Sequence, residues 1–473
     1  MPADPFRVVL INPYELGRQP FALAEPAALL KRAGFAVDCL DLSLQSLDAQ
    51  VLAGARLVAL YVGMHTATRI AVEALPRIRS LAPAAHLCVY GLYAPMNEAL
   101  LRSLGCKTVL GGETEPALVS LAERLRANGA DAAQTGPVVH TGKVQFVVPD
   151  RSGLPDLSRY AQLVLADGTR RIAAFAEASR GCKHLCRHCP IVPVYEGRFR
   201  TVPVDVVIED IRQQVQAGAT HVSFGDPDFL NGPTHAMRIA RALHETFPDV
   251  TFDATIKVQH LIEHAALLPE LRRFGCEFIT SAVEAIDDEI LRHLAKNHTS
   301  RDFDRAVALT RAAGIALAPT FVAFTPWTTL DDYLNLCRFI RAHALEDEVD
   351  PVQLSLRLLV PPGSALLAAP DIAPFLGPLD EQALSYRWTH PDPRMDRLEA
   401  DVSALVEEAT RTGEPPAATF GRIHRLAAAT AGVPDEAPAP AAIGRKPRRE
   451  PPPHLTEPWF CCAQPTRRQL DAF

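Results

Sequence analysis

Three cysteines that lie close together carry the clearest chemical signal in the chain. Cys182, Cys186 and Cys189 stand in the run ASRGCKHLCRHCP, directly after an expected strand. Three thiolates with this C-x3-C-x2-C spacing can bind three irons of a 4Fe–4S cluster from one short loop. The next cysteine, Cys276, is far along the chain. Because electron carriers usually close every iron with a cysteine, the count of three indicates chemistry at an open fourth iron.

A structural zinc site is the alternative for the same loop. His184 and His188 lie among the cysteines, and three cysteines with one histidine are a common set of zinc ligands. Zinc modules usually place their ligand pairs on two separated knuckles, and no second C-x2-C follows here. We therefore favour the cluster, and we expect both histidines to be exposed or to lie behind the ligands.

The cysteine loop resembles the signature of the radical S-adenosylmethionine (SAM) enzymes. The resemblance implies that the amino and carboxylate groups of the methionine part of SAM chelate the open iron. It also implies that an electron from the cluster cleaves SAM homolytically to give a carbon radical. A small-molecule substrate and an electron donor such as flavodoxin or ferredoxin would complete the reaction.

Strand and helix patterns alternate after the cysteine loop as they do before it. From residue 170 the chain shows six β/α units, the last strand being VQLSLRLL (352–359). Six units, rather than eight, fit a partial (β/α)6 TIM barrel of radical SAM type. In such barrels the catalytic groups stand on the loops that follow the strands.

One of these loops, GDPDF (225–229), ends the second strand of the expected barrel. Radical SAM enzymes often present a motif there that contacts the methionyl amine of SAM. The backbone of Gly225 and the carboxylates of Asp226 or Asp228 are the candidates, because an ammonium group needs carbonyl or carboxylate acceptors. A plain Asp–Pro turn with a capping aspartate is the alternative.

Two further loops supply charged candidates. Glu284 ends the fourth strand, and the stretch from it to Lys296 resembles the family's I-E-S…L…K-x-x-T pattern, which implies a polar contact with SAM or substrate. A carboxylate at the barrel mouth would otherwise be costly unless it were paired. Arg357, in LRLLVPPGSALL (356–367), resembles the arginine of an R-x-x-P-G-T-x-L stretch and is a candidate anion contact. A structural salt bridge is the alternative for Arg357.

The segment before the barrel is predicted to be a doubly wound, Rossmann-like α/β domain. Strand-like runs such as RVVLIN (7–12) alternate with helical runs, one of which has Pro26 in its first turn and Gly34 as its stop. With LINP, GFAVDCLDL, YVGMHTAT, VYG and GGETEPAL, this part resembles the cobalamin-binding domain of one class of radical SAM enzymes. It lacks the D-x-H-x-x-G run, so no histidine is offered to cobalt. Cobalamin bound without such a histidine and an empty docking domain both stay open.

The tail carries a second cysteine group. Cys461 and Cys462 are adjacent in HLTEPWFCCAQPTRRQLDAF, which resembles the end of the CUAEP/CCAEP-tail radical SAM proteins, with Gln464 in place of glutamate. Adjacent thiols suit the chelation of a soft centre such as trivalent arsenic better than a mutual disulfide. We expect both to be catalytic, with a SAM-derived carbon fragment transferred to that centre; an aromatic-flanked tail that caps the active site, with the cysteines only packing, stays open beside it. The alternatives are a cobalamin-dependent methyltransferase or methylthiotransferase, and a non-catalytic iron–sulfur or zinc scaffold.

The fold class that follows is α/β with a helical C-terminal region. The predicted segments are 1–125 for the cobalamin-binding-like Rossmann domain, 126–168 for a linker, 169–375 for the barrel, 376–433 for the helical region and 434–473 for a Pro-rich mobile tail.

Composition limits the partners and the compartment. The net charge of −7 and the pI near 6.2 offer no basic field for nucleic acid. No apolar run has the form of a signal peptide or the length of a membrane span. Ten cysteines, three of them clustered, indicate reduced thiols and a cytoplasmic location rather than a disulfide framework.

Overall fold

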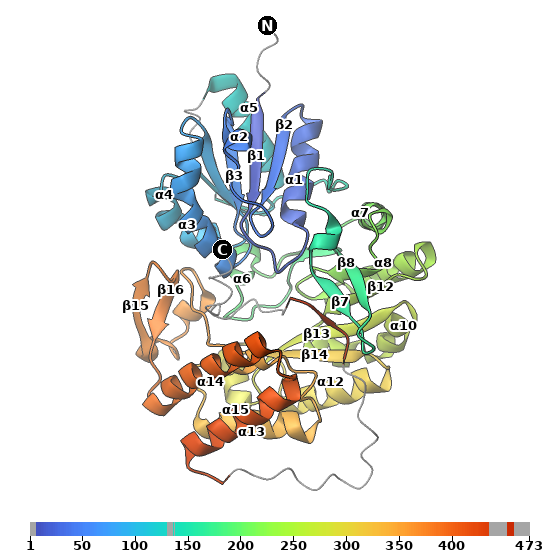
Figure 1. The fold of residues 1–473 in the computed structure, drawn as a ribbon, viewed down its shortest axis with the longest axis vertical. Helices are drawn as coiled ribbons and strands as arrows, with labels where there is room; N and C mark the ends of the chain where they lie inside the picture. Colours follow the sequence, from blue (N-terminus) through green and yellow to red (C-terminus); the bar gives the residue numbers. More distant parts are fainter. Residues whose placement is uncertain (1–5, 130–135, 137, 435–451, 458–473) are drawn as a thin grey trace.

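Two sheets, one above the other in Figure 1 and each built mainly from parallel strands, form the framework of the molecule. The computed structural model describes residues 6–129, 136, 138–434 and 452–457. Figure 1 shows the first sheet, from the N-terminal third of the chain, above a second, curled sheet, with two long C-terminal helices below. No helix in these ranges has the length and apolar character of a membrane span.

The first sheet is doubly wound, as predicted. Its strands follow the order β2-β1-β3-β4-β5-β6, and every pair is parallel. Apolar side chains of α1 and α5 cover one face, and those of α2, α3 and α4 cover the other. The order reverses between β1 and β3, so the loops after these two strands flank the crevice where such sheets bind ligands. The elements are β1 (Arg7–Asn12), α1 (Phe21–Arg32), β2 (Ala36–Asp41), α2 (Ala49–Leu52), β3 (Leu57–Tyr61), α3 (His65–Leu81), β4 (His86–Tyr90), α4 (Glu98–Ser103), β5 (Thr108–Gly112), α5 (Glu115–Asn128) and β6 (Val139–His140).

The start of the first helix differs from the prediction. Helix α1 begins at Phe21, so Pro26 lies inside it rather than in its first turn. A proline there leaves the carbonyl four residues earlier without its helical partner. Here that carbonyl, on Ala22, accepts a hydrogen bond of 2.8 Å from the Tyr90 hydroxyl on β4. The sheet thus replaces the bond that Pro26 removes, and Gly34 ends the helix with a φ of +80° as expected.

The stretch predicted as a linker, 126–168, contributes strands to both sheets. Strand β6 extends the first sheet, and β7 (Gln162–Val164) pairs antiparallel with β8 in the second. The limits of the domains remain a prediction, but this stretch is ordered by pairing at both of its ends.

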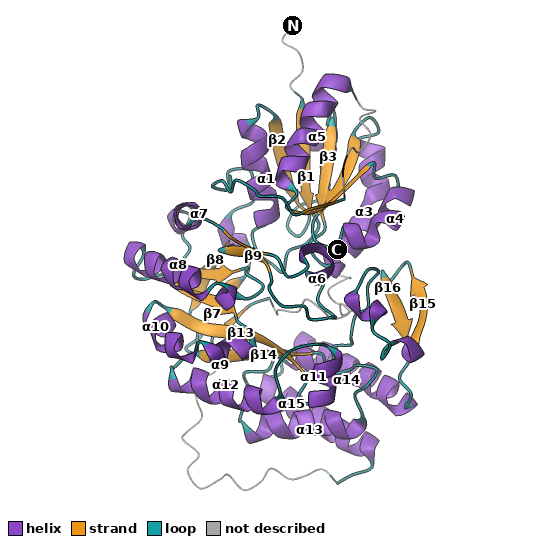
Figure 2. Cartoon of the chain, turned by 180° about the vertical axis from the view of Figure 1, so that it is seen from behind, coloured by secondary structure: helices purple, strands orange, loops and turns teal. Residues whose placement is uncertain are grey.

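The second sheet is the curled partial barrel. Strands β8, β11, β12, β13 and β14 are parallel neighbours, and helices lie along their outer side; Figure 2 shows α8, α10 and α12 beside the sheet that carries β13 and β14. The elements are β8 (Arg170–Ala176), β9 (Ser179–Gly181), α6 (Val192–Tyr195), β10 (Phe199–Thr201), α7 (Val204–Gln216), β11 (His221–Phe224), α8 (Pro233–Thr246), β12 (Thr251–Thr255), α9 (Val258–Glu263), α10 (Leu268–Arg273), β13 (Cys276–Glu284), α11 (Asp288–His293), α12 (Ser300–Ala312), β14 (Ala316–Phe321) and α13 (Leu330–Ala342).

The sixth strand predicted at 352–359 is reduced to a single bridge. Asp350 caps a 3-10 turn over Pro351–Leu354, so the first half of the segment is helical. Only Arg357 forms a parallel bridge, with Phe324, through hydrogen bonds on either side of it. The alternating apolar pattern predicted a strand, whereas the capping aspartate and the proline start a turn.

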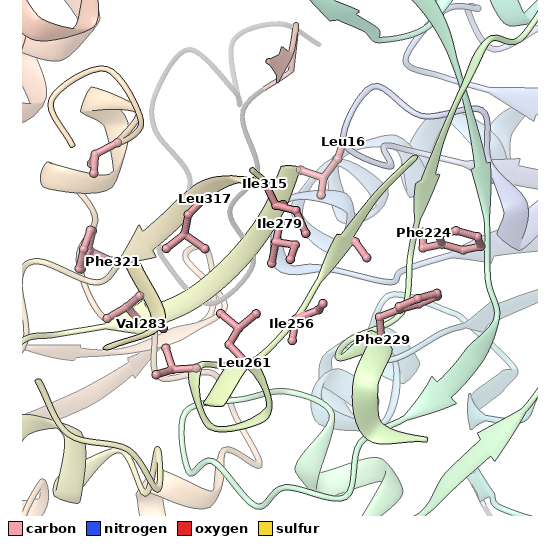
Figure 3. Close-up of a cluster of buried hydrophobic side chains, with 14 of the residues drawn as sticks. Leu16, Phe224, Phe229, Ile256, Leu261, Ile279, Val283, Ile315, Leu317 and Phe321 are labelled. Carbon is pink, nitrogen blue, oxygen red and sulfur yellow. The ribbon is translucent and has the colours of Figure 1, made fainter. Parts of the chain in front are cut away.

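The barrel core lies between the sheet and its helices. Figure 3 shows Phe224, Ile256 and Ile279 from the strands and the loops after them packed with Leu261 of α9. Leu16, from the loop after β1, belongs to the same buried cluster. A loop of the first sheet is therefore built into the core of the second.

The C-terminal region combines helices with a small sheet. Helices α14 (Pro393–Thr412) and α15 (Pro416–Ala431) confirm the expected helical pair, and α15 packs on α13. A two-stranded sheet, β15 (Leu376–Asp380) with β16 (Ser385–Trp388), precedes them and was not predicted. The chain then returns at β17 (His454–Leu455), which pairs antiparallel with β7 at the edge of the barrel sheet.

Candidate functional site

The cysteine loop leaves the barrel sheet through a short hairpin. Strand β9 pairs with β10, and Gly181 at its end has a φ of +72°. A side chain at Gly181 would collide with the carbonyl of Arg198 and the ring of Tyr195, so only glycine permits this approach. Cys182 and Cys186, which follow, are buried, and Cys189 is half-buried.

Polar groups from two other loops lie beside the thiols. Lys257, directly after β12, directs its ammonium at Cys186, with Nζ 3.5 Å from Sγ. Asn231 accepts from the backbone of Lys183 at 3.4 Å and lies 3.9 Å from Cys182 Sγ. Burial raises the pKa of the Cys182 thiol to about 11. A thiol of this kind becomes a ligand only when a bound metal stabilises its thiolate, as a cluster would.

Glu284 occupies the mouth of the barrel in a conformation that few residues other than glycine adopt. Its φ is +71°, and its carboxylate lies 3.1 Å from His188 Nε2 and 3.2 Å from Lys296 Nζ. Burial opposes its ionisation, but Lys296 and His188 prevail and lower the pKa of Glu284 to about 2. Left-handed backbone outside glycine costs about 1–3 kcal/mol and clusters at functional sites. His188 lies behind the cysteines, as expected from the sequence.

His298, beyond Lys296, is buried, and neither of its ring nitrogens has a hydrogen-bond partner of ordinary geometry. Burial, together with the charges of Lys296 and Lys257, lowers the pKa of His298 to about 3. A neutral imidazole with unused nitrogens between two ammonium groups suits a polar, anionic ligand. The methionine carboxylate of SAM has this character.

The candidate residues of the GDPDF loop have different surroundings. A side chain at Gly225 would enter the ring of Phe175, which explains the glycine. Asp226 accepts hydrogen bonds from the amide of Ala178, at 2.9 Å, and from the hydroxyl of Ser179, and burial raises its pKa to about 7. Its carboxylate thereby holds the turn that leads into the cysteine loop.

Asp228 is fully buried and faces two imidazoles. Its Oδ2 lies 2.7 Å from His260 Nδ1 and 3.5 Å from His184 Nε2. Burial opposes ionisation, but the two imidazoles prevail and lower the pKa of Asp228 to about 2. The assignment of Gly225, Asp226 and Asp228 to the amine of SAM remains a prediction.

Arg357 is engaged away from the mouth of the barrel. Its guanidinium donates to Asp396 on α14 at 2.9 Å and to the carbonyl of Trp388 at 2.7 Å. It also stacks on the Trp388 ring, 3.5 Å from the centroid. These contacts match the structural salt bridge that was the alternative for this residue, and the anion contact remains a prediction.

An arginine beside the cluster loop joins the two sheets. Arg180 on β9 binds Glu25 of α1 and Glu115 of α5, the latter at 2.7 Å, and Glu113 at 3.2 Å. Glu177 adds a fourth carboxylate at 2.9 Å. The two glutamates of the GGETE run therefore face the cysteine loop from the carboxyl edge of the first sheet.

The same edge holds buried polar atoms without hydrogen-bond partners. They include Glu15 Oε2 and Arg18 Nε on the loop after β1, and His65 Nδ1 and Arg69 Nε at the start of α3. Buried polar groups are normally paired, so several orphans in one crevice indicate a polar ligand that supplies the partners. The orphans stand on the loop after β1 and at the start of α3, which follows β3, and in doubly wound sheets ligands bind beside these two strands.

A cavity of about 480 Å³ opens on the inner side of the barrel strands β12 to β14. Arg18 reaches it from the first sheet, and Pro452–Leu455 and Glu457 form another wall. Glu457 also accepts a hydrogen bond from Tyr14. Cys461 and Cys462, the catalytic pair predicted from the sequence, lie outside the described residues.

Several residues near the thiols were not singled out from the sequence. Lys257 directly follows the predicted strand 251–256, and Asn231 follows GDPDF, so the rule that places function after barrel strands reaches both. His298, in the loop between α11 and α12, and His260, on α9, had no such signal, because a lone histidine looks like any core or surface residue.

Comparison with known proteins gives these residues a context. Residues 177–340 match the radical SAM superfamily. The hopanoid C-3 methylase of Methylococcus capsulatus is 27% identical over 46% of this chain and 43% of that protein. The ribosomal protein uS12 methylthiotransferase of Trichlorobacter lovleyi is 22% identical over 35% of this chain and 39% of its own length. The chain thus spans less than half the length of these curated relatives.

Solved structures extend the likeness to the first sheet. The cobalamin-dependent SAM radical enzyme OxsB, with aqua-cobalamin bound, matches 86% of this chain and 67% of its own with a TM-score of 0.68 and 16% identity. The SAM methyltransferase TsrM from Kitasatospora setae, with cobalamin and a 4Fe–4S cluster bound, matches 72% of this chain and 71% of its own with a TM-score of 0.57 and 20% identity. The cysteine loop and the curled sheet thus lie in the part of the chain that matches the radical SAM superfamily, and together with the Rossmann-like domain before them they have a fold similar to that of the cobalamin-bound enzymes OxsB and TsrM.

Proposed function

We propose that the protein is a cobalamin-dependent radical SAM methyltransferase that acts on a small molecule. The observation that carries the proposal is the contact between the carboxyl edge of the first sheet and the cluster loop. Arg180 lies two residues before Cys182 and binds Glu113 and Glu115 at that edge. A cofactor held by the first sheet would therefore lie against the loop that holds the cluster.

Three groups of residues would hold the cofactors. Cys182, Cys186 and Cys189 bind the cluster, which when reduced supplies an electron to SAM. Lys257, Lys296 and His298 form a cationic and polar pocket for the methionine carboxylate, with Glu284 anchoring Lys296 at 3.2 Å. The orphaned atoms of Glu15, Arg18, His65 and Arg69 suit cobalamin, whose corrin ring carries amide side chains that both donate and accept hydrogen bonds.

Cobalamin would bind without a protein ligand to its cobalt from the loop after β1. That loop reads Pro13-Tyr14-Glu15-Leu16-Gly17-Arg18 and contains no histidine. When bound, cobalamin supplies a carrier for the methyl group between SAM and the substrate. Glu15 and Arg18 would orient it, since both are on the loop after β1 and Arg18 lies over the ring of Phe175 in β8, 4.8 Å from its centroid.

The cavity inside the barrel is the proposed substrate site. Its volume of about 480 Å³ lies within the range of small-molecule pockets. Threonines and Asp253 on the inner faces of β12 to β14 give it polar contacts beside Phe278. A small, partly polar substrate fits this lining.

The test is cobalamin binding followed by transfer of a labelled methyl group. Protein produced with cobalamin uptake should retain the cofactor through anaerobic gel filtration and show its absorption bands. With a reductant and methyl-deuterated SAM, the label should appear in methylcobalamin released from the protein. An unlabelled, cofactor-free protein that still cleaves SAM would refute the cobalamin proposal and leave the radical SAM chemistry intact.

Transfer of a SAM-derived fragment to a thiophilic element is the second candidate. The observation that favours it is the wall that Pro452–Glu457 forms in the substrate cavity, only a few residues before Cys461. In this version a methyl or 3-amino-3-carboxypropyl group would pass to trivalent arsenic held by Cys461 and Cys462. Titration of trivalent arsenic against the wild type and a Cys461→Ser, Cys462→Ser double variant tests it. Equal binding curves would dismiss the chelating pair.

A further inference from the structure

Three potential metal ligands converge behind the cysteine loop. His184 comes from that loop, Asp228 from the loop after β11, and His260 from α9 after β12. One donor atom from each lies within 4.8 Å of the other two. The two imidazole rings are 4.8 Å apart between centroids, and all three side chains are almost completely buried.

The carboxylate of Asp228 lies within ion-pair distance of both imidazoles, but the hydrogen-bond angles are poor. His260 Nδ1 lies 2.7 Å from Asp228 Oδ2, yet both atoms, and His184 Nε2, are buried without a hydrogen bond of ordinary angle. Two nitrogens and one oxygen thus face a common point with unused lone pairs. Three such orphans together would be costly in a dry interior, and one bound cation would satisfy all of them.

We propose that His184, Asp228 and His260 bind a divalent transition-metal ion such as Zn²⁺ or Fe²⁺, separate from the cluster. Two neutral imidazoles and one carboxylate are a common ligand set for these ions, and leave open positions for water or a ligand. The ionised Asp228 offsets one positive charge of the ion. The Asp228 Oδ1 atom accepts the backbone N–H of Lys257 at 3.4 Å, which orients the carboxylate from behind.

The position of this ion gives it a consequence for the cluster. It would tie the cysteine loop, through His184, to two barrel loops, one of which continues into Lys257 beside Cys186. The metal would therefore fix the position of Cys186 relative to the ammonium group of Lys257. This role is independent of cobalamin, because none of the three ligands touches the first sheet.

Zinc loading of the reconstituted holoenzyme tests the site. The protein is prepared anaerobically with its cluster, incubated with zinc, passed through a desalting column, and analysed for iron, acid-labile sulfide and zinc. We expect equal iron and sulfide, as in a 4Fe–4S cluster, and about one zinc per chain in addition. X-ray absorption spectroscopy at the zinc edge should show nitrogen and oxygen neighbours at about 2.0–2.1 Å and no sulfur at about 2.3 Å.

Two variants of neighbouring histidines sharpen the test. His260→Ala should lose the zinc while it keeps iron and sulfide. His264→Ala should keep the zinc, although His264 directly follows α9 and its ring is 5.4 Å from that of His260. If circular dichroism shows that His260→Ala does not fold, Asp228→Asn replaces it, since it keeps the shape and removes the charge.

Three outcomes would overturn the proposal. Zinc bound equally by wild type and both ligand variants would place the ion elsewhere. Loss of zinc in His264→Ala would point instead to the group formed by His260, Glu263 and His264. Sulfur neighbours in the zinc spectrum would mean that zinc had displaced iron from the cysteines.

Discussion

Lys257 Nζ lies 3.5 Å from Cys186 Sγ, which sets a buried positive charge beside the second cysteine of the cluster loop. Lys257 is buried directly after β12, where it precedes the first residue of α9. Its ammonium is therefore available to the sulfur and to whatever that sulfur binds.

Replacing Lys257 with methionine should make the cluster harder to reduce. A cation at this range favours the added electron, and at an effective dielectric constant near 20 such an interaction is worth at most about 4 kcal/mol. We expect the midpoint potential of the cluster to fall in a potentiometric titration followed by EPR, and the rate of SAM cleavage to fall at least about tenfold. Lys257→Arg keeps the charge and should stay near the wild-type potential. An unchanged potential in Lys257→Met would remove the electrostatic role.

Glu284 should contribute stability that disappears in acid. Its pKa is lowered to about 2 in the fold, against about 4.3 for a free glutamate. The stabilisation is thus complete above about pH 4.3 and is lost as the pH falls through 2. Glu284→Gln should lose about 3–5 kcal/mol at pH 7, because His188 and Lys296 keep buried charge or dipole without their partner. Its unfolding free energy should then depend less on pH between about 4.3 and 2 than that of the wild type, as measured by denaturant titration.

Arg180→Met should loosen the contact between the two sheets. The change leaves Glu25 and Glu115 buried without their cation, and Glu113 with Arg200 alone at 3.3 Å, at a cost of about 3–5 kcal/mol. Hydrogen exchange should rise in α1 and in the first turn of α5. Arg212→Met serves as the control, since its ion pair with Glu209 is exposed. Equal exchange in the two variants would contradict the prediction.

Glu25, one of the carboxylates around Arg180, should make stability depend on pH in the direction opposite to that of Glu284. Burial, only partly countered by Arg180, raises the pKa of Glu25 above its ordinary value. A raised pKa means that the fold holds the proton more tightly than the unfolded chain does. The contribution of Glu25 is therefore complete below about pH 4.3 and is lost as the pH rises through the raised value. Glu25→Gln should abolish this loss, which thermal melts between pH 6 and 9 would detect.

Gly225→Ala should disturb the loop that supports the cluster. The added methyl group would enter the ring of Phe175, and overpacking of this kind costs about 1–3 kcal/mol. Gly142→Ala is the matched control, because nothing lies within 4 Å of the new methyl group there. We expect a lower denaturation midpoint and less iron per chain for Gly225→Ala only. A second change, Phe175→Leu, should recover part of the loss.

The sequence was most informative where a local rule decides the structure. Alternating strands and helices predicted both sheets, and the C-x3-C-x2-C spacing predicted the cysteine loop. Strand 352–359 failed because the pattern of apolar residues is the same for a strand and for a buried turn, and the cap at Asp350 decided between them. The start of α1 failed because a proline inside a helix is tolerated only through a distant partner, here Tyr90.

Most contacts between site residues could not be predicted from the sequence, because they join residues that are far apart in the chain. Glu284 and Lys296 were singled out, and they do pair, because both belong to one short pattern. Arg180 and Glu25 were not, because 155 residues separate them and only the docking of the sheets brings them together. Lone histidines such as His260 carry no periodic signal, so their convergence on Asp228 is visible only in space.

Strand β17 can pair with β7 only late in the synthesis of the chain. Thr456 and Gln162, which pair at the barrel edge, are 294 residues apart, so the edge strand β7 leaves the ribosome long before the segment that covers it. At about 5–20 residues per second the delay is roughly 15–60 s. During that interval the edge of the sheet is open to strands of other chains, a known route to aggregation. Rapid closure by the last described residues would therefore matter for the yield of active protein as much as for the shape of its cavity.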